Sequence, residues 1–321
     1  MPDAATAVAN FIALFFLVSV LIVSALCAAG LWRKRREPLE ARRPVPWRGG
    51  AVLAIGLVWL ALQATLPYAF GLQREAEGDQ EAALTAEQAE TILLAAAVAN
   101  FATVIIGGVA LAVAVKADVD DLGFGTKHLR DDIRLGVHAA FAVIVPVYIV
   151  QAILSQWVSG RHPIEEVIRD NPEPMVIAIS ALTAVIAAPL GEEFFFRVLF
   201  QGWLERFWPV SRPIVELTAV DTTMVDDRSA PPTTDHGPLT TDSSTIRLPP
   251  ILISAAFFSL LHLGWPAGPV RPDPIPLFLL SLMLGYVYQR THRIWPSLIV
   301  HFCLNGMSIL VLAASAITKS P

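Results

Sequence analysis

Six polar side chains capable of chemistry lie within long apolar stretches of this 321-residue chain. They are Glu192, Glu193 and Arg197 in one stretch, His262 in a second, and His301 and Asn305 in a third. A charged residue at the centre of a membrane helix costs about 2.5 to 3.5 kcal/mol, and folding alone does not require that cost. Ionisable groups at such a depth therefore indicate a functional site in a shared intramembrane polar cavity.

The two adjacent glutamates are predicted to have different roles. Residues four apart lie on one face of a helix, so Glu193 and Arg197 can form an ion pair that offsets most of the cost of burying them. Glu192 points about 100° away from Glu193 and has no cation on its own helix. An unpaired carboxylate in an apolar setting suits a general base, which takes up a proton during the reaction. We therefore predict that Glu192 is catalytic and that the Glu193–Arg197 pair supports it.

The other three residues complete a predicted hydrolytic site. A rise of about 1.5 Å per residue places Glu192 and His262 at the same depth, with Asn305 about 2 Å away from that level. His262 can help Glu192 to polarise a water molecule. His301 and Asn305 share a helix face, from which their N–H groups can stabilise the oxyanion formed when water attacks an amide. This chemistry is that of a hydrolase.

The composition predicts an all-α, polytopic membrane protein. Hydrophobic residues make up 55% of the chain and charged residues only 16%, whereas soluble domains carry about 25% charged residues. Apolar runs of about 20 residues are long enough to cross a bilayer. Eight such runs are expected to span the membrane, and they cover residues 8–32, 49–71, 91–115, 135–158, 175–204, 250–265, 275–289 and 294–317.

The distribution of basic residues predicts the orientation in the membrane. Of the 23 Lys and Arg residues, 17 fall in the loops after the first, third, fifth and seventh runs. Because basic loops stay in the cytoplasm, both termini are expected outside, and the active site is expected to open toward the cytoplasm. The expected location is the plasma (inner) membrane of a bacterium.

The net charge of -5, without a long basic stretch, excludes nucleic acid as a partner. Both cysteines lie in apolar runs, which excludes a disulfide framework and a Cys-rich metal site.

Two regions are expected along the chain. Residues 1–174 form an N-terminal four-helix membrane region, and residues 175–321 form the catalytic membrane region. The second region is interrupted at about residues 216–248 by a polar stretch rich in Thr, Asp, Ser and Pro. Such a composition buries too little apolar surface to offset the entropy of ordering it. We predict a disordered cytoplasmic loop there, and a tolerated insertion is favoured over a regulatory segment.

The polar residues fall in three motifs that resemble those of the CAAX-protease and bacteriocin-processing (CPBP, or Abi) family of intramembrane glutamic endopeptidases. Residues 192–197 (EEFFFR) match its EExxxR motif, residues 258–262 (FSLLH) its FxxxH motif, and residues 301–305 (HFCLN) its HxxxN motif. Each motif alone is weak, but the three occur in order and each in its own apolar run. Phe258 is expected to pack within the site. Val198 stands where family members usually have glycine.

The resemblance implies intramembrane proteolysis of a membrane-associated protein or peptide, with the lipid bilayer as the surroundings of the reaction. Eukaryotic members of the family remove the last three residues of prenylated CAAX proteins. Carried over by motif, Glu192 and His262 would activate water, and His301 with Asn305 would form the oxyanion site. No cofactor or metal is expected.

Three alternatives stay open. A zinc-dependent intramembrane metalloprotease could use a glutamate and two histidines as ligands, but the usual HExxH motif is absent from the sequence. A non-proteolytic membrane scaffold or immunity protein of the same family would have no reason to keep costly intramembrane charges. A transporter could use paired acids as a proton relay, although the sequence lacks a repeated half with broken helices.

Overall fold

The computed structural model describes residues 4–34, 37, 39–40, 44–72, 84–158, 160, 163–208, 246–263 and 273–319. Within these ranges the chain is helical and contains no β-strand, so the predicted all-α class is confirmed. The helices are α1 (Ala4–Lys34), α2 (Gly49–Ala69), α3 (Ala86–Val115), α4 (Leu129–Leu154), α5 (Pro163–Asp170), α6 (Pro174–Ala181), α7 (Ala188–Glu193), α8 (Gly202–Leu204), α9 (Leu248–Leu261), α10 (Pro274–Thr291) and α11 (Ile294–Lys319).

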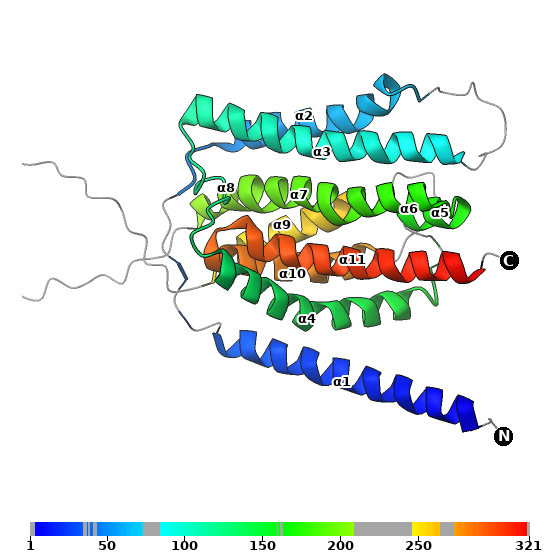
Figure 1. Cartoon of the computed structure of the whole chain (residues 1–321). Coiled ribbons are helices and arrows are strands. Elements are labelled where there is room, and N and C mark those ends of the chain that lie inside the picture. Colours follow the sequence, from blue (N-terminus) through cyan, green and yellow to red (C-terminus); the bar gives the residue numbers. More distant parts are fainter. Residues whose placement is uncertain are drawn as a thin grey trace, which may run out of the picture.

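Six helical segments in the described part of the chain are long and apolar enough to cross a membrane. They lie in α1, α2, α3, α4, the run Pro174–Phe207 that contains α6 to α8, and α11. Helix α9 has 14 residues and is about 21 Å long, which is shorter than the bilayer core of about 30 Å. Helix α10, with 18 residues, ends on the polar residues Gln289, Arg290 and Thr291. These two helices lie alongside the other six in the bundle (Figure 1).

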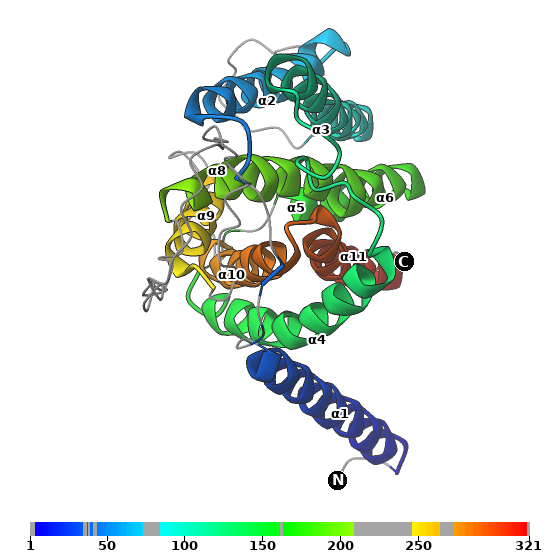
Figure 2. The same ribbon diagram turned by 90° about the vertical axis from the view of Figure 1, so that its left-hand side faces the viewer.

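The run Pro174–Phe207, called the central run below, lies between two layers of helices (Figures 1 and 2). Helices α2 and α3 cover one side of it, and α9, α10 and α11 cover the other. Helix α4 packs outside α10 and α11, and α1 packs on α4 at the edge of the bundle. The glutamates of the central run are therefore enclosed by helices from both halves of the chain.

Aromatic packing fixes the central run against its neighbours. The three phenylalanines at residues 194–196 are buried, and the ring centroids of Phe196 and Phe258 lie 5.0 Å apart. Gly56 and Gly107 let α2 and α3 approach, because a Cβ atom at either position would lie 2.9 Å from the Phe195 or Phe194 ring. Large aromatic side chains dominate the burial energy of such a core. The polar residues of the central run thus have rigid surroundings.

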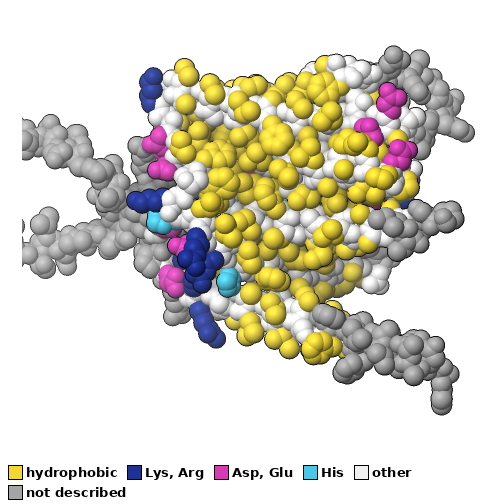
Figure 3. All heavy atoms as spheres, in the orientation of Figure 1, with side chains coloured by type: hydrophobic (Ala, Val, Ile, Leu, Met, Phe, Trp, Pro, Cys, Tyr) yellow, Lys and Arg dark blue, Asp and Glu magenta, His cyan; other side chains and the backbone are white. Residues whose placement is uncertain are grey.

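Lys and Arg side chains gather at one end of the bundle, called the basic end below, which lies on the left of Figure 3 and also carries some carboxylates and histidines, whereas apolar side chains cover the flanks. Arg293 lies at this basic end, in the turn between α10 and α11, and it pairs with Asp132 and Glu40. Burial alone would lower the pKa of Arg293, but the two carboxylates outweigh burial and raise the pKa. The arginine therefore stays charged and joins α11 to the start of α4.

Two differences from the sequence-based boundaries concern loops. The short helix α5 lies between the fourth and fifth expected spans, where no helix was expected. Of the expected disordered loop at about residues 216–248, residues 216–245 lie outside the described residues, and α9 already begins at Leu248. The division into regions 1–174 and 175–321 stays a prediction.

Candidate active site

Glu192 and Glu193 lie in α7, which is flanked by two π-helical segments, Leu182–Ala187 and Phe194–Gln201. A π-helical segment changes the direction in which the following side chains point, and such segments are frequent at functional sites. Gly191 sets the approach of α7 to α3, because a Cβ atom there would lie 2.2 Å from Asn100 Oδ1. Only glycine permits this close contact beside the two glutamates.

The Glu192 carboxylate faces two imidazole rings. Its Oε1 atom lies 4.0 Å from His262 Nε2, and its Oε2 atom lies 3.6 Å from His301 Nε2. Both separations are longer than a hydrogen bond, and polar groups at this spacing can share a water molecule. The side chains of Glu192 and His262 are 17% and 24% exposed, against 3% for His301. The gap between Glu192 and His262 is therefore the accessible side of the cluster.

Glu193 is fully buried and bonded on both sides. Its Oε2 accepts a hydrogen bond from Arg197 Nε at 3.3 Å, so the ion pair expected from the spacing is present. Its Oε1 lies 3.1 Å from His301 Nδ1. His301 lies between the two glutamates and contacts both carboxylates, so the different roles predicted for them would be coupled through one imidazole.

The hydrogen bonds assign the tautomers of both histidines. His262 Nδ1 lies 2.7 Å from the carbonyl oxygen of Phe258, and a carbonyl only accepts, so Nδ1 carries the proton. His301 Nδ1 likewise donates to the Glu193 carboxylate when Glu193 is ionised. In the neutral rings both Nε2 atoms are then acceptors, and both face Glu192. With Glu192 ionised and both rings neutral, three acceptors face one another, and a water molecule could donate to two of them.

The two remaining motif residues, Asn305 and Phe258, have different neighbours. Asn305 Nδ2 donates to the Ala184 carbonyl at 2.7 Å and so joins α11 to the first π-helical segment. A carboxamide has two N–H groups, so one is left for another acceptor. Phe258 is buried, with its ring centroid 4.6 Å from that of His262 and 6.0 Å from that of His301. It therefore has the packing position expected of it.

The backbone position of His262 differs from the prediction. Helix α9 ends at Leu261, and His262 follows as its C-terminal cap with its N–H bonded to the Ser259 carbonyl. The sequence continues with Gly264 and Pro266, residue types that do not continue a helix. His262 thus lies at the end of a short helix rather than inside a span.

Sequence reasoning missed the residues that hold Arg197. Its two Nη atoms donate to Ser254 at 3.0 Å and to Ser281 at 2.6 Å, and both serines are fully buried. A small polar residue in an otherwise apolar helix was the available signal. These serines attach the Arg197–Glu193–His301 chain to α9 and α10.

Residues 238–307 match the family model described as type II CAAX prenyl endopeptidase Rce1-like. The match covers 70 of the 321 residues and agrees there with the family that the three motifs predict. The Rce1-like match includes Phe258, His262, His301 and Asn305, whereas the motif with the two glutamates precedes it. The matched family is a peptidase family, and the apolar helices together with the match indicate an integral membrane protein. No curated protein and no solved structure matches the chain.

Proposed function

We propose that the protein is an intramembrane endopeptidase that hydrolyses a peptide bond of a membrane-associated protein or peptide. The observation that supports this proposal is the gap at Glu192, whose carboxylate faces the Nε2 atoms of His262 and His301 at 4.0 and 3.6 Å. A water molecule beside these atoms, at hydrogen-bond distance from the carboxylate and from one ring nitrogen, could bridge a separation of this size.

In the proposed reaction, Glu192 takes a proton from that water while the water oxygen attacks the carbonyl carbon of the scissile bond. The carbonyl oxygen becomes an oxyanion, which accepts the second N–H of Asn305. His301 can add a second donor only when Nε2 also carries a proton, because its Nδ1–H is directed at Glu193. The tetrahedral intermediate then expels the amine, which takes the proton from Glu192 directly or through His262. The products are one carboxylic acid and one amine.

No metal enters this mechanism. The described residues hold no group of three or more His, Cys, Asp or Glu side chains arranged to bind a metal ion. Metal independence stays a prediction that chelation tests directly.

The proposed setting is a bacterial plasma membrane, with both termini outside and the basic end of the bundle in the cytoplasm. The basic loops support this orientation through the positive-inside rule. An exposed position at the basic end, such as Lys127→Cys, should then resist membrane-impermeant thiol reagents in intact cells and react after permeabilisation. Labelling of intact cells at that position would reverse the orientation.

A proteomic comparison tests the function in cells and does not require an identified substrate. Cells that carry the wild-type protein should contain a terminal fragment that is absent with Glu192→Ala. Glu173→Ala, at an exposed carboxylate that precedes α6, is the matched control and should keep the fragment. An identical set of fragments in all three strains would favour the non-proteolytic scaffold.

A further inference from the structure

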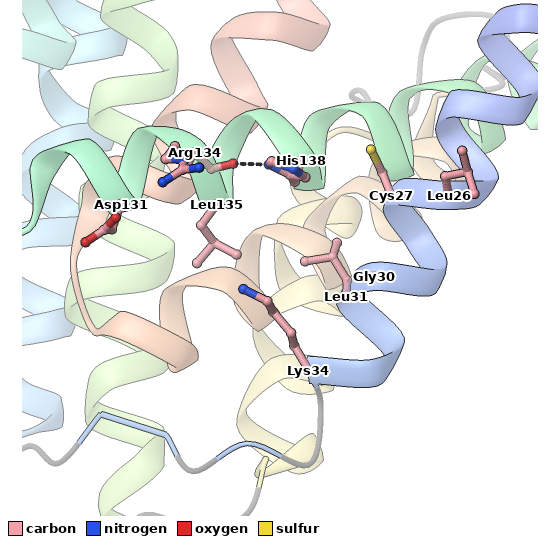
Figure 4. Close-up of a pocket in the computed structure, with 9 residues that line it drawn as sticks. All are labelled: Leu26, Cys27, Gly30, Leu31, Lys34, Asp131, Arg134, Leu135 and His138. Carbon is pink, nitrogen blue, oxygen red and sulfur yellow. Dashed lines mark hydrogen bonds between the residues drawn. The ribbon is translucent and has the colours of Figure 1, made fainter.

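We propose that an anionic glycerophospholipid binds in a cleft between α1 and α4 at the basic end of the bundle. The cleft has a volume of about 670 Å³, which is within the range of small-molecule sites. Helix α1 lines it with Leu26, Cys27, Gly30, Leu31 and Lys34, and α4 lines it with Asp131, Arg134, Leu135 and His138 (Figure 4). This cleft is separate from the glutamate cluster, and the proposal does not depend on the proposed function.

The walls of the cleft are fixed by hydrogen bonds of α1. The Ser24 hydroxyl donates to the Ala142 carbonyl of α4 at 3.5 Å. Arg290 at the end of α10 donates to the Lys34 carbonyl at 2.8 Å. Helix α1 is thus attached to α4 and α10 on either side of the cleft, although most of its described side chains from Leu14 onward are exposed.

The cleft is charged at its surface end and apolar at its deeper end, like a phospholipid with its head group and acyl chains. Lys34 is the last residue of α1, and Leu26 lies eight residues earlier, about 12 Å deeper along the helix. Arg134 and Asp131 lie in the first turns of α4, at the same end as Lys34. Charged groups therefore line the membrane surface and apolar groups line the interior, as a head group and its acyl chains require. Basic pockets of this kind between membrane helices bind anionic head groups.

The charged side chains of the cleft favour binding of a single lipid phosphate group. Lys34 and Arg134 are exposed cations on opposite walls, and Lys34 reaches from α1 toward α4 (Figure 4). His138 Nδ1 donates to the Arg134 carbonyl at 2.6 Å, which keeps the imidazole at the rim. Among the described residues of the lining, Asp131 supplies the carboxylate, and it can accept hydrogen bonds from head-group hydroxyls. Two cations and one acceptor suit the phosphate and hydroxyls of phosphatidylglycerol.

Native mass spectrometry of the purified full-length protein tests the site. The protein is incubated with an equal mixture of phosphatidylglycerol and phosphatidylcholine that have identical acyl chains. Wild type should retain phosphatidylglycerol preferentially, and Lys34→Gln with Arg134→Gln should lower that retention about 10-fold or more, since each surface cation contributes to anionic lipid binding. Arg48→Gln with Lys127→Gln removes two exposed cations outside the cleft and should retain wild-type binding.

A second pair of variants tests the apolar part of the cleft. A Cβ atom at Gly30 would meet nothing within 4 Å, so Gly30→Leu should enter the cleft without distorting the fold and displace the lipid. Gly50→Leu on α2 is equally open and is the control. Asp131→Asn keeps an acceptor for the head-group hydroxyls and removes a negative charge near the phosphate, so it should retain phosphatidylglycerol at least as well as wild type.

Three results would overturn the proposal. The first is equal retention of both lipids by wild type, and the second is unchanged phosphatidylglycerol retention in Lys34→Gln/Arg134→Gln or in Gly30→Leu. The third is competition by free glycerol phosphate as strong as that by the intact lipid, which would remove the role of the acyl chains.

Discussion

Two clusters that contain glutamate and histidine lie along the central run, and they differ in whether the glutamate carboxylate is within hydrogen-bond distance of its neighbours. The deep cluster consists of Glu192, Glu193, Arg197, His262 and His301. The end cluster consists of Gln201, Glu205, Arg247, Gln289 and His292. In the end cluster, Glu205 Oε2 lies 2.9 Å from His292 Nε2. Its Oε1 accepts from Gln201 at 3.2 Å and from Gln289 at 3.3 Å. In the deep cluster, Glu192 keeps both imidazoles at 3.6 Å or more.

Residue type alone therefore does not distinguish the proposed catalytic carboxylate, Glu192, from Glu205. Glu205 bonds partners from both sides of the undescribed segment 209–245, since Arg247 donates to the Glu205 carbonyl at 3.1 Å. These hydrogen bonds join the end of the central run to α9 and α10, which is a structural role. Glu192 instead lies beyond hydrogen-bond distance of both imidazoles and is partly exposed. We therefore expect changes in the two clusters to affect different measurements.

Glu193→Gln should have the largest effect, on stability. The change leaves the fully buried Arg197 without its anionic partner, and breaking a buried pair costs about 3 to 5 kcal/mol. Unfolding of the purified protein in detergent measures the loss. Glu193→Gln with Arg197→Met should recover much of the folded yield. Activity should recover less, because an amide holds His301 Nδ1 more weakly than a carboxylate does. A stable but inactive Glu193→Gln would transfer the role of base to Glu193.

Glu192→Gln should leave folding intact and remove the chemistry. The side chain is partly exposed and forms no close ion pair with the two imidazoles, so the melting temperature should stay at the wild-type value. Peptide cleavage should fall about 100-fold or more, the scale of general-base contributions. A rate near wild type with a substrate that wild type cleaves would contradict the proposed function.

Glu205→Gln should reduce stability without reducing cleavage, and the loss of stability should be smaller than that caused by Glu193→Gln. It removes the charge opposite His292 in a mostly buried pair, and a lost charge-assisted hydrogen bond costs about 1.5 to 3 kcal/mol. The free energy of unfolding should decrease while the cleavage rate per folded molecule stays unchanged. A folded Glu205→Gln with little activity would break the distinction between the clusters.

Chelation should have no measurable effect on activity. A glutamate with a histidine can activate water unaided, so prolonged treatment with a zinc chelator should leave kcat/KM unchanged. Loss of activity that only zinc restores would instead assign ligand roles to Glu192, His262 and His301.

The sequence predicted those features that depend on local periodicity. The long apolar helices and the Glu193–Arg197 pair follow from spacing along one helix, and the structure contains both. The contact of His301 with both glutamates could not be predicted, because it depends on which face of α11 meets α7. Two π-helical segments beside the glutamates also shift the direction of side chains without a sequence signature. The end cluster was missed because polar residues at the ends of apolar runs are common.

The central claim is that Glu192 activates water and does not itself attack the substrate to form a covalent bond. A single turnover in water labelled with the heavy oxygen isotope tests this claim by mass analysis of the product and of the peptide that contains Glu192, because water that opens a covalent intermediate at the Glu192 carbonyl leaves label in that side chain. If Glu192 is a general base, the new carboxylate of the product carries the label and the Glu192 side chain carries none. Label in the Glu192 carboxylate would show a covalent intermediate on that residue and would contradict the account.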